Sequence, residues 1–293
     1  MKPKASIVII NKNDRAVADT LVAIRDIVRK PVAIETVVID ASSGKLDDVA
    51  KQFPDVKWFD FKSKTGRRFT IPEQRNTGVQ KARGDIIVYT DASCVPQADW
   101  LELLLAPILS GEESIVAGST VSRGGPTIHD QNHARLGKGK KYLNECPTIN
   151  LAFTRKAFKD IGGFDECFDY GSDVDFSWRA ADKGYKVRYV PQALVAHDWG
   201  KASEDIKRAY RYGIARARLY KKHPQRYKQL FGQDITALIY PVYILGLPTT
   251  FWFWPYPLLI LVPLAKNIRQ QPHRVLQKHL VYGVGVLREL VRV

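Results

Sequence analysis

The sequence contains little sulfur, with three cysteines and one methionine among 293 residues. Cys94, Cys146 and Cys167 are far apart and show neither the spacing of a zinc site nor that of a disulfide framework. We therefore expect a protein of a reducing compartment. Few residues precede the apolar run that begins at Ala5, so we also expect no signal peptide and a catalytic part in the cytosol.

Acidic residues are scarce relative to basic ones. The chain has 45 Lys and Arg against 30 Asp and Glu, which gives a net charge of +15 and an isoelectric point near 9.7. Such a balance favours a polyanionic partner: nucleic acid, an anionic membrane surface or a phosphorylated substrate. A hydrophobic content of 45% is sufficient for a packed core, and the length fits one large domain with or without an appendage.

Charge is absent from residues 235–265. This stretch is longer than the roughly 20 residues that cross a bilayer once and shorter than the roughly 40 of a full hairpin. Basic residues flank it, and five prolines interrupt it: Pro241, Pro248, Pro255, Pro257 and Pro263. We predict a re-entrant or two-short-helix membrane element on the cytoplasmic face, with an amphipathic helix from about Val275. The alternative is a soluble hydrophobic subdomain or a dimer interface.

A basic helix is predicted over residues 203–223, where seven Lys and Arg alternate with tyrosines. This pattern is typical of a helix at an anionic membrane surface, although a solvated helix is the alternative. Basic and aromatic residues also occur in RNA-binding proteins. Since the sequence contains nothing that resembles a nucleic-acid-binding module, we predict no nucleic-acid partner.

The N-terminal part alternates apolar runs with helical patterns. Strands are predicted at residues 5–10, 36–39 and 85–90, which are mostly apolar as in buried parallel strands, and at residues 56–61. This rhythm predicts an α/β fold with an open, mostly parallel sheet flanked by helices, and a ligand at the carboxyl ends of the strands. We place this domain at residues 1–225 and a membrane-associated helical region at residues 226–293.

Polar residues follow these predicted strands. Asp40 can accept hydrogen bonds from a base or ribose, or it can cap the helix that follows Lys45. Asp91 offers a hard oxygen ligand for Mg²⁺ or Mn²⁺ carrying a diphosphate. The loop at residues 62–68 holds four cations, including Arg67 and Arg68, and is either a solvated loop or a clamp over phosphates.

The stretch 162–200 carries the remaining candidates. Asp169, Asp173 and Asp175 cluster where a loop leads into a helix, with Ser172 as the expected N-cap. Two β-runs separated by Pro191 then end at His197. Considered singly, these residues fit structural roles, because first-turn aspartates favour the helix dipole.

Together, the motifs resemble those of family 2 glycosyltransferases of the GT-A fold. In order, they are SIVII, VVID-x-S-S, RN-x-G-x-x-x-A-x-G-D-I-I, D-x-S, GGFDE, DVD and a strand-end histidine, between Ser6 and His197. The resemblance implies a nucleotide-sugar donor, UDP by default, and a divalent metal, Mn²⁺ or Mg²⁺.

The resemblance also implies residue roles. Asp173 matches the general base. The donor-nucleotide site comprises Asn11, Asn13, Asp40, Arg75, Asn76 and Asp91, and the metal site comprises Asp91, Ser93 and His197. Apart from the resemblance, we assign Arg67, Arg68, Asn150, Ser172 and Trp178 to an acceptor or diphosphate site; for Asn150 a loop or core role is the alternative. Ser93 replaces the second acid of the D-x-D motif, and Ser172 replaces the Glu of the family's Glu-Asp pair, which weakens the expected metal affinity.

One base and no covalent nucleophile predict transfer with inversion at the anomeric carbon. The expected acceptor is a hydroxyl of a membrane-linked glycan or lipid, and Asp173 is expected to stay ionised at its helix N-terminus. Two alternatives remain: a nucleotidyltransferase, against which GGFDE and the Asp173 region argue, and a catalytically degenerate scaffold that binds lipid or a partner enzyme.

Overall fold

The computed structural model describes residues 3–27, 33–64, 66, 70–124, 139–200, 202–266 and 272–292. The chain forms two compact units, Met1–Trp199 and Gly200–Val293. The sequence placed the boundary at residue 225. The difference concerns helix α8 (Ala202–Lys222), which packs along α11 (Pro272–Leu290) and therefore belongs to the second unit.

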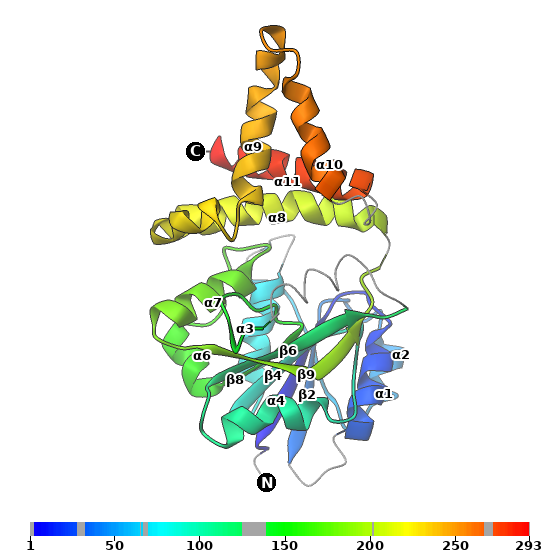
Figure 1. The fold of residues 1–293 in the computed structure, drawn as a ribbon. Coiled ribbons are helices and arrows are strands. Elements are labelled where there is room, and N and C mark those ends of the chain that lie inside the picture. Colours follow the sequence, from blue (N-terminus) through cyan, green and yellow to red (C-terminus); the bar gives the residue numbers. More distant parts are fainter. Residues whose placement is uncertain are drawn as a thin grey trace. The chain divides into compact units, whose positions relative to one another are not determined.

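The first unit is built on one sheet with the strand order β3-β2-β1-β4-β8-β6-β9-β5, and β7 pairs with β9 beside this path (Figure 1). The strands of the described residues are β1 (Ala5–Asn11), β2 (Ile34–Asp40), β3 (Lys57–Asp60), β4 (Ile86–Asp91), β5 (Cys94–Pro96), β6 (Ile115–Ser122), β7 (Tyr142–Leu143), β8 (Asn150–Thr154) and β9 (Val187–His197). The four strands from β3 to β4 are parallel, as predicted.

The other half of the sheet corrects the expectation of a mostly parallel sheet. Strand β8 runs antiparallel to β4 and β6, and β9 runs antiparallel to β5 and β7 but parallel to β6. The sheet is therefore mixed. Strand β9 is also continuous where two runs were predicted, because the β6–β9 ladder shifts register between Gly118 and Ser119 and so accommodates Pro191.

Helices cover both faces of the sheet. Along β1, Ile7 and Ile9 face one core and Val8 faces the other, as the two-residue period of a strand requires. The first core receives α1 (Val17–Ile27) and α4 (Trp100–Leu109), and the second receives α3 (Ile71–Lys81), α6 (Arg155–Ile161) and α7 (Ser172–Asp182). A short helix, α2 (Asp47–Ala50), follows β2.

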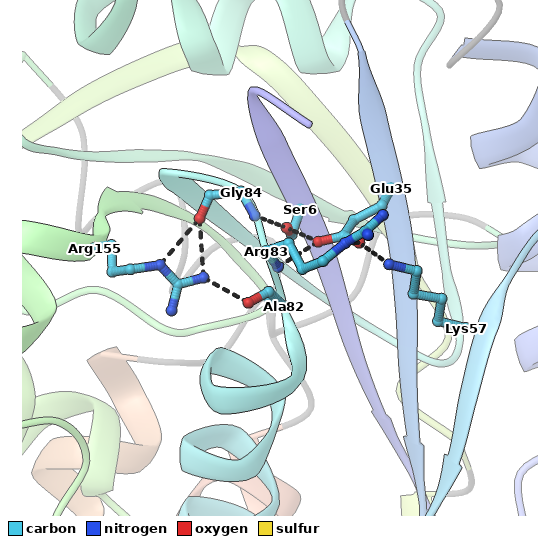
Figure 2. A network of polar contacts seen from close by, with 7 residues as sticks. All are labelled: Ser6, Glu35, Lys57, Ala82, Arg83, Gly84 and Arg155. Atoms are coloured by element: carbon cyan, nitrogen blue, oxygen red, sulfur yellow. Dashed lines mark hydrogen bonds and ion pairs between the residues drawn. The ribbon is translucent and has the colours of Figure 1, made fainter. Parts of the chain in front are cut away.

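A polar network ties together the amino-terminal edge of the sheet (Figure 2). Glu35 of β2, almost fully buried, accepts hydrogen bonds from Ser6 Oγ at 2.6 Å, from Lys57 Nζ and from the backbone N–H of Arg83. Arg155 lies on the other side of the Ala82–Gly84 turn and donates to three carbonyl oxygens at the end of α3. The A-x-G-D motif, residues 82–85, thus stabilises the fold. It lies far in sequence from the candidate site residues on α7.

The second unit contains α8, α9 (Thr236–Gly246), α10 (Leu261–Lys266) and α11, with 3-10 segments at Pro224–Phe231, Leu247–Phe251 and Tyr256–Ile260. The uncharged stretch contains the short helices α9 and α10, and α11 begins at Pro272, close to the Val275 expected for the terminal helix. The membrane association of this region stays a prediction. Helices α8 and α11 cross at glycines: a Cβ on Gly213 would lie 2.1 Å from the carbonyl oxygen of Tyr282, and one on Gly285 would lie 2.2 Å from that of Tyr210. Only glycine permits this approach.

Much of the positive charge of α8 is bonded inside the second unit. Arg208 pairs with Asp205 at 2.9 Å, and Arg216 pairs with Asp234 at 2.9 Å. Arg218 pairs with Glu289 at 2.8 Å. Of these pairs, Arg218–Glu289 joins α8 to α11, whereas Arg208–Asp205 lies within α8. Part of the positive charge of α8 is therefore already paired inside the second unit, and the prediction that α8 contacts anionic lipid concerns only the remaining cations.

Within the described ranges, no single helix has both the length and the apolar composition to cross a membrane; residues 224–231 and 236–251 reach that composition only together and are bent by 77°.

Candidate active site

Three of the predicted site residues meet at the carboxyl edge of the parallel strands. Asn11 ends β1 and pairs in register with Asp40 at the end of β2, and Ile10 pairs with Asp91 at the end of β4. The sheet thus brings together an amide and two carboxylates from three parts of the sequence. This edge is where open α/β sheets bind their ligands.

The Asp40 carboxylate is held rigidly. It is 2% exposed and accepts hydrogen bonds from the Ser42 backbone N–H at 3.2 Å, from Ser42 Oγ and from Trp58 Nε1 at 3.3 Å. Ser42 Oγ in turn accepts from the backbone N–H of Asn13 at 2.6 Å, and Asn13 adopts a left-handed conformation with φ of 58°. Asp40 therefore orders the loop after β1 and does not cap α2.

Asn11 is the buried polar group with the fewest bonds in this cluster. Its side chain is 3% exposed, and neither its amide nitrogen nor its amide oxygen has a hydrogen-bond partner among the described residues. Buried amides are almost always bonded, and an unsatisfied one costs about 1–3 kcal/mol. An amide offers one donor group and one acceptor, as the edge of a nucleobase requires.

The predicted metal ligands also meet. Strand β5 pairs with β9 so that Cys94 lies opposite His197, which brings the turn after β4 to the end of β9. His197 Nε2 lies 3.1 Å from Ser93 Oγ and 4.0 Å from Asp91 Oδ2. Across the part of the chain that the structure describes, no group of three or more His, Cys, Asp or Glu side chains could hold a metal ion. At the predicted metal position, the third side chain is Ser93.

The start of α7 is linked to α3 by Arg75. Its guanidinium donates to Ser172 Oγ at 3.1 Å and lies over the ring of Phe164. The N-cap of α7 is Gly171, with φ of 80°, and Ser172 is the first helical residue. The expectation of Ser172 as N-cap is therefore wrong: glycine supplies the left-handed turn, and the serine hydroxyl, which is 2% exposed, is bonded to Arg75.

Asp173 differs from the expectation of a carboxylate kept ionised by the helix N-terminus. Burial raises its pKa, and this effect exceeds the opposing ones of the Arg75 charge and of the backbone N–H groups of α7. The hydrogen bond from the Val174 N–H to Asp173 Oδ1, at 3.0 Å, belongs to these weaker effects. A carboxylate with a raised pKa is a stronger base when it is ionised.

Glu145 was missed by the sequence reasoning. It accepts a hydrogen bond from Trp178 Nε1 at 3.2 Å, and its charge helps to raise the pKa of Asp173. The next residue, Cys146, makes a further link to α7: its backbone N–H donates to Ser177 Oγ at 3.1 Å. No motif surrounds Glu145; only the pairing of this segment with α7 brings it near the base.

Two predicted acceptor-site residues have structural roles. Asn150 is buried and its amide is fully used: it donates to the carbonyl oxygens of Ser119 and Ala193 at 2.7 and 2.8 Å and accepts from Trp100 Nε1 at 2.8 Å. These bonds fix the irregular β6–β9 ladder. Trp178 is 1% exposed, and its indole N–H is bonded to Glu145, so the described contacts give it a role in packing.

Asn76 holds a loop. Its amide donates to the carbonyl oxygen of Phe164 and to Glu166 Oε1, both at 2.8 Å, and accepts from the Phe164 N–H at 2.9 Å. The G-G-F-D-E segment is thereby anchored to α3, and the contact of this side chain with the nucleotide stays a prediction. Likewise, Asp175 is fully buried and pairs with Arg179 at 2.8 Å.

Arg67 and Arg68, the predicted phosphate clamp, lie outside the described residues. The described start of their loop is anchored by Glu73 of α3, which accepts from Ser63 Oγ and from the Lys64 N–H, both at 2.7 Å.

The mixed sheet with helices on both faces is an α/β fold of the GT-A type. The family profile described as "Glycosyl transferase family 2" matches residues 6–168, and that described as "Glycosyl transferase family group 2" matches residues 106–282. The chain belongs to glycosyl transferase family 2.

Curated relatives share part of the chain. A pre-mycofactocin glycosyltransferase of Mycobacterium tuberculosis is 32% identical over 165 residues, which cover 52% of this chain and 35% of the relative. Glycosyltransferase AglE of Haloferax volcanii is 23% identical over 171 residues, or 56% of each protein. The matched region thus spans about a third of the first relative and somewhat over half of the second.

Solved structures share the fold. The mannosyltransferase PcManGT from Pyrobaculum calidifontis, in complex with GDP-Man and Mn²⁺, superposes with a TM-score of 0.69 at 20% identity, over 99% of this chain and 88% of the other. GalNAc-T7 with UDP, GalNAc and Mn²⁺ gives 0.55 at 19% identity, over 80% and 57%.

Proposed function

We propose that this protein transfers a sugar from a nucleoside diphosphate sugar, with UDP as the first nucleotide to test, to a hydroxyl of a membrane-linked glycan or lipid, with inversion at the anomeric carbon. The observation that carries the proposal is the register of the parallel strands, which brings Asn11, Asp40 and Asp91 to one edge of the sheet. Asn11 and Asp40 supply hydrogen-bonding groups for a nucleoside, and Asp91 supplies charge for the metal that holds its diphosphate.

The donor atoms at the metal position fit a divalent ion. Asp91 contributes a carboxylate oxygen, His197 an imidazole nitrogen and Ser93 a hydroxyl. A mixed oxygen and nitrogen set suits Mn²⁺ better than Mg²⁺, which prefers six oxygen ligands. When bound, such an ion neutralises the charge that develops on the departing diphosphate. With one carboxylate in the set, we expect weak binding of the ion until the diphosphate adds its own oxygens.

Asp173 is the base in this proposal. Burial, helped by the charge of Glu145, raises its pKa against the opposing effect of Arg75, and in the ionised form Asp173 can accept the proton of the attacking hydroxyl. Arg75 fixes this arrangement from α3 through Ser172. A single base that activates the acceptor, with the leaving group on the opposite face of the sugar, gives inversion.

The membrane-linked acceptor and the cytoplasmic membrane face are proposed on the composition of the second unit. Residues 235–265 carry no charge, and many of their apolar side chains are exposed, including Leu245, Phe251 and Val262. A transferase held at a lipid surface meets lipid-linked acceptors in two dimensions, which raises their effective concentration.

The proposal is tested first by binding and then by turnover. Calorimetric titration of the full chain with UDP, GDP and dTDP, each with Mn²⁺, Mg²⁺ or EDTA, should show metal-dependent binding of one nucleotide. Asp91→Asn should remove the metal dependence. Absence of binding by a folded protein would contradict the donor site.

Turnover tests the base. Asp173→Asn should bind the nucleotide like the unmodified chain but lose at least about 100-fold in transfer rate. The matched control is Asp182→Asn at the other end of α7, which should keep full activity. Full activity of the Asp173→Asn protein would refute the role of this residue, and a product that retains the donor's anomeric configuration would refute inversion. Release of pyrophosphate in place of the nucleoside diphosphate would indicate a nucleotidyltransferase.

A further inference from the structure

The second unit contains an apolar hairpin whose arms pack against each other. We call residues 236–265 the aromatic hairpin; Figure 1 shows its arms, α9 and α10, standing away from α8 and α11. The rings of Tyr243 and Tyr256 stack at 5.6 Å, and Tyr256 donates to the carbonyl oxygen of Tyr243 at 3.1 Å. Gly246 leaves room for Tyr256, because a Cβ there would lie 2.0 Å from its hydroxyl. The hairpin is therefore a packed element that keeps its shape.

Only the root of the hairpin is covered within the second unit. Ala237 and Tyr240 are buried, and the Tyr240 hydroxyl lies 2.9 Å from His279 Nδ1 of α11. The tip is bare: Phe251 is 88% exposed, Trp252 82% and Trp254 74%. Large aromatic side chains are normally buried in a protein. The exposure of three of them at one turn therefore indicates that an apolar environment covers this turn.

Both threonine hydroxyls and several backbone N–H groups of the tip are satisfied within the hairpin. Thr249 Oγ1 donates to the carbonyl oxygen of Gly246 at 2.7 Å, and Thr250 Oγ1 donates to that of Leu247 at 2.6 Å. The Trp252 and Phe253 N–H groups bond to Thr249, and three positions of the turn are prolines without an N–H: Pro248, Pro255 and Pro257. Internal satisfaction of this kind is what hydrocarbon demands and what an aqueous interface does not.

The length of the free part matches one leaflet. Beyond the buried root, one arm has five α-helical residues (242–246) and five 3-10 residues (247–251), and the other has five 3-10 residues (256–260) and five α-helical ones (261–265). At about 1.5 and 2.0 Å per residue, each arm rises about 17 Å. The hydrocarbon core of a bilayer is about 30 Å thick, so an arm reaches about its middle.

We propose that the aromatic hairpin inserts tip first into a single leaflet and holds the enzyme at the membrane without crossing it. The occupant of this surface is lipid hydrocarbon, because exposed leucines and valines continue along both arms and no charged side chain interrupts them. This inference deepens the proposed function and rests on it, because insertion brings the enzyme to the membrane-linked acceptor proposed above. Its physical test needs neither donor nor acceptor.

Vesicle flotation of the full chain tests the partner. The probe is phosphatidylcholine vesicles with and without phosphatidylglycerol. Trp252→Ser/Trp254→Ser should lower the partition coefficient at least about tenfold, because two large apolar groups leave the hydrocarbon. The control is Leu109→Ser on α4, an exposed apolar residue of the first unit, which should leave the coefficient unchanged. Equal partition of the tip variant and the unmodified chain would overturn the proposal.

Depth is tested with lipids brominated near the headgroup, at mid-chain or at the chain end. Trp252→Phe/Trp254→Phe keeps the tip apolar, so its difference from the unmodified chain isolates the quenching of these two indoles. We expect the strongest quenching by the chain-end bromines. Strongest quenching near the headgroup would overturn single-leaflet insertion, because it would place the tip at a surface.

A second copy of the chain is the competing occupant. Concentration-dependent association without quenching, abolished in the tip variant, would replace lipid with a self-interface and so overturn the proposal. Failure of insertion together with retained transfer to a water-soluble acceptor would leave the transferase activity standing, whereas insertion without any nucleotide binding would contradict the proposed function alone.

Discussion

Substitution of Glu35 by Gln should destabilise the first unit in a pH-dependent manner (Figure 2). Burial by itself raises the pKa of Glu35, but the hydrogen bonds from Lys57, Ser6 and the Arg83 N–H outweigh it and lower the pKa from 4.5 to about 2. A carboxyl group with a lowered pKa in the folded state adds stability above its unfolded pKa and loses it as the pH falls toward the folded pKa. The contribution of Glu35 is therefore complete above about pH 5 and disappears between about pH 5 and pH 2.

The size of this effect follows from the shift. A lowering from 4.5 to about 2 corresponds to about 3 kcal/mol. Because the side chains of Lys57 and Arg83 are 34% and 62% exposed, water screens part of the attraction. We therefore expect Glu35→Gln to lower the free energy of unfolding by about 2 kcal/mol at pH 7.

Urea unfolding, followed by tryptophan fluorescence at pH 7, 5 and 3, measures the difference between the variant and the unmodified chain. The difference should shrink steadily as the pH falls. The control is Asp48→Asn: Asp48 pairs with Arg15, which also lowers its pKa, but the pair is exposed, so a much smaller effect is expected. A difference that is equal at pH 7 and pH 3 would refute the reasoning, since it would show that packing and not charge is lost.

Three further predictions concern the site and the sheet. Asn11→Leu should remove an unsatisfied amide, raise the free energy of unfolding by about 1 kcal/mol and abolish nucleotide binding in calorimetry; lower stability would contradict this reading. Glu145→Gln should shift the acidic limb of the pH–rate profile to lower pH, because the Glu145 charge helps to raise the pKa of Asp173, the base that must be ionised; an unmoved limb would remove Glu145 from the site. Gly118→Ala should cost about 1–3 kcal/mol in urea unfolding, because a Cβ there would lie 2.2 Å from a carbonyl oxygen, whereas Gly232→Ala, with open space around it, should cost far less.

The parallel half of the sheet could be predicted because local sequence determines it. Apolar runs such as residues 5–10 and 36–39 have apolar side chains on both faces of the strand. They are therefore stable only as central strands that are covered on both sides. Polar residues at their ends, such as Asp40 and Asp91, then reach one edge as a consequence of parallel pairing. The proximity of Asp91, Ser93 and His197 could also be predicted, because the order of the family's motifs along the sequence implies it.

The corrections concern bonds that sequence cannot assign. An asparagine at the start of a strand has the same pattern whether its amide faces a substrate or, like that of Asn150, bonds to two backbone carbonyls and an indole. Ser172 and Gly171 are both common at helix starts. The hydroxyl of Ser172 is bonded to Arg75, which lies 97 residues away in sequence, and Gly171 is the N-cap.

The sequence by itself determined the family, the buried strands, the strand-end carboxylates and the uncharged segment at residues 235–265, because composition and two-residue or helical periodicity are local properties. Only the tertiary structure decided which polar groups are already bonded. It showed that the side chains of Asn76 and Trp178 are bonded within the fold, brought Glu145 near Asp173 and raised the pKa of Asp173 by burial. The physical reason is that hydrogen-bond satisfaction and desolvation depend on neighbours that are distant in the chain, and these exist only once it has folded.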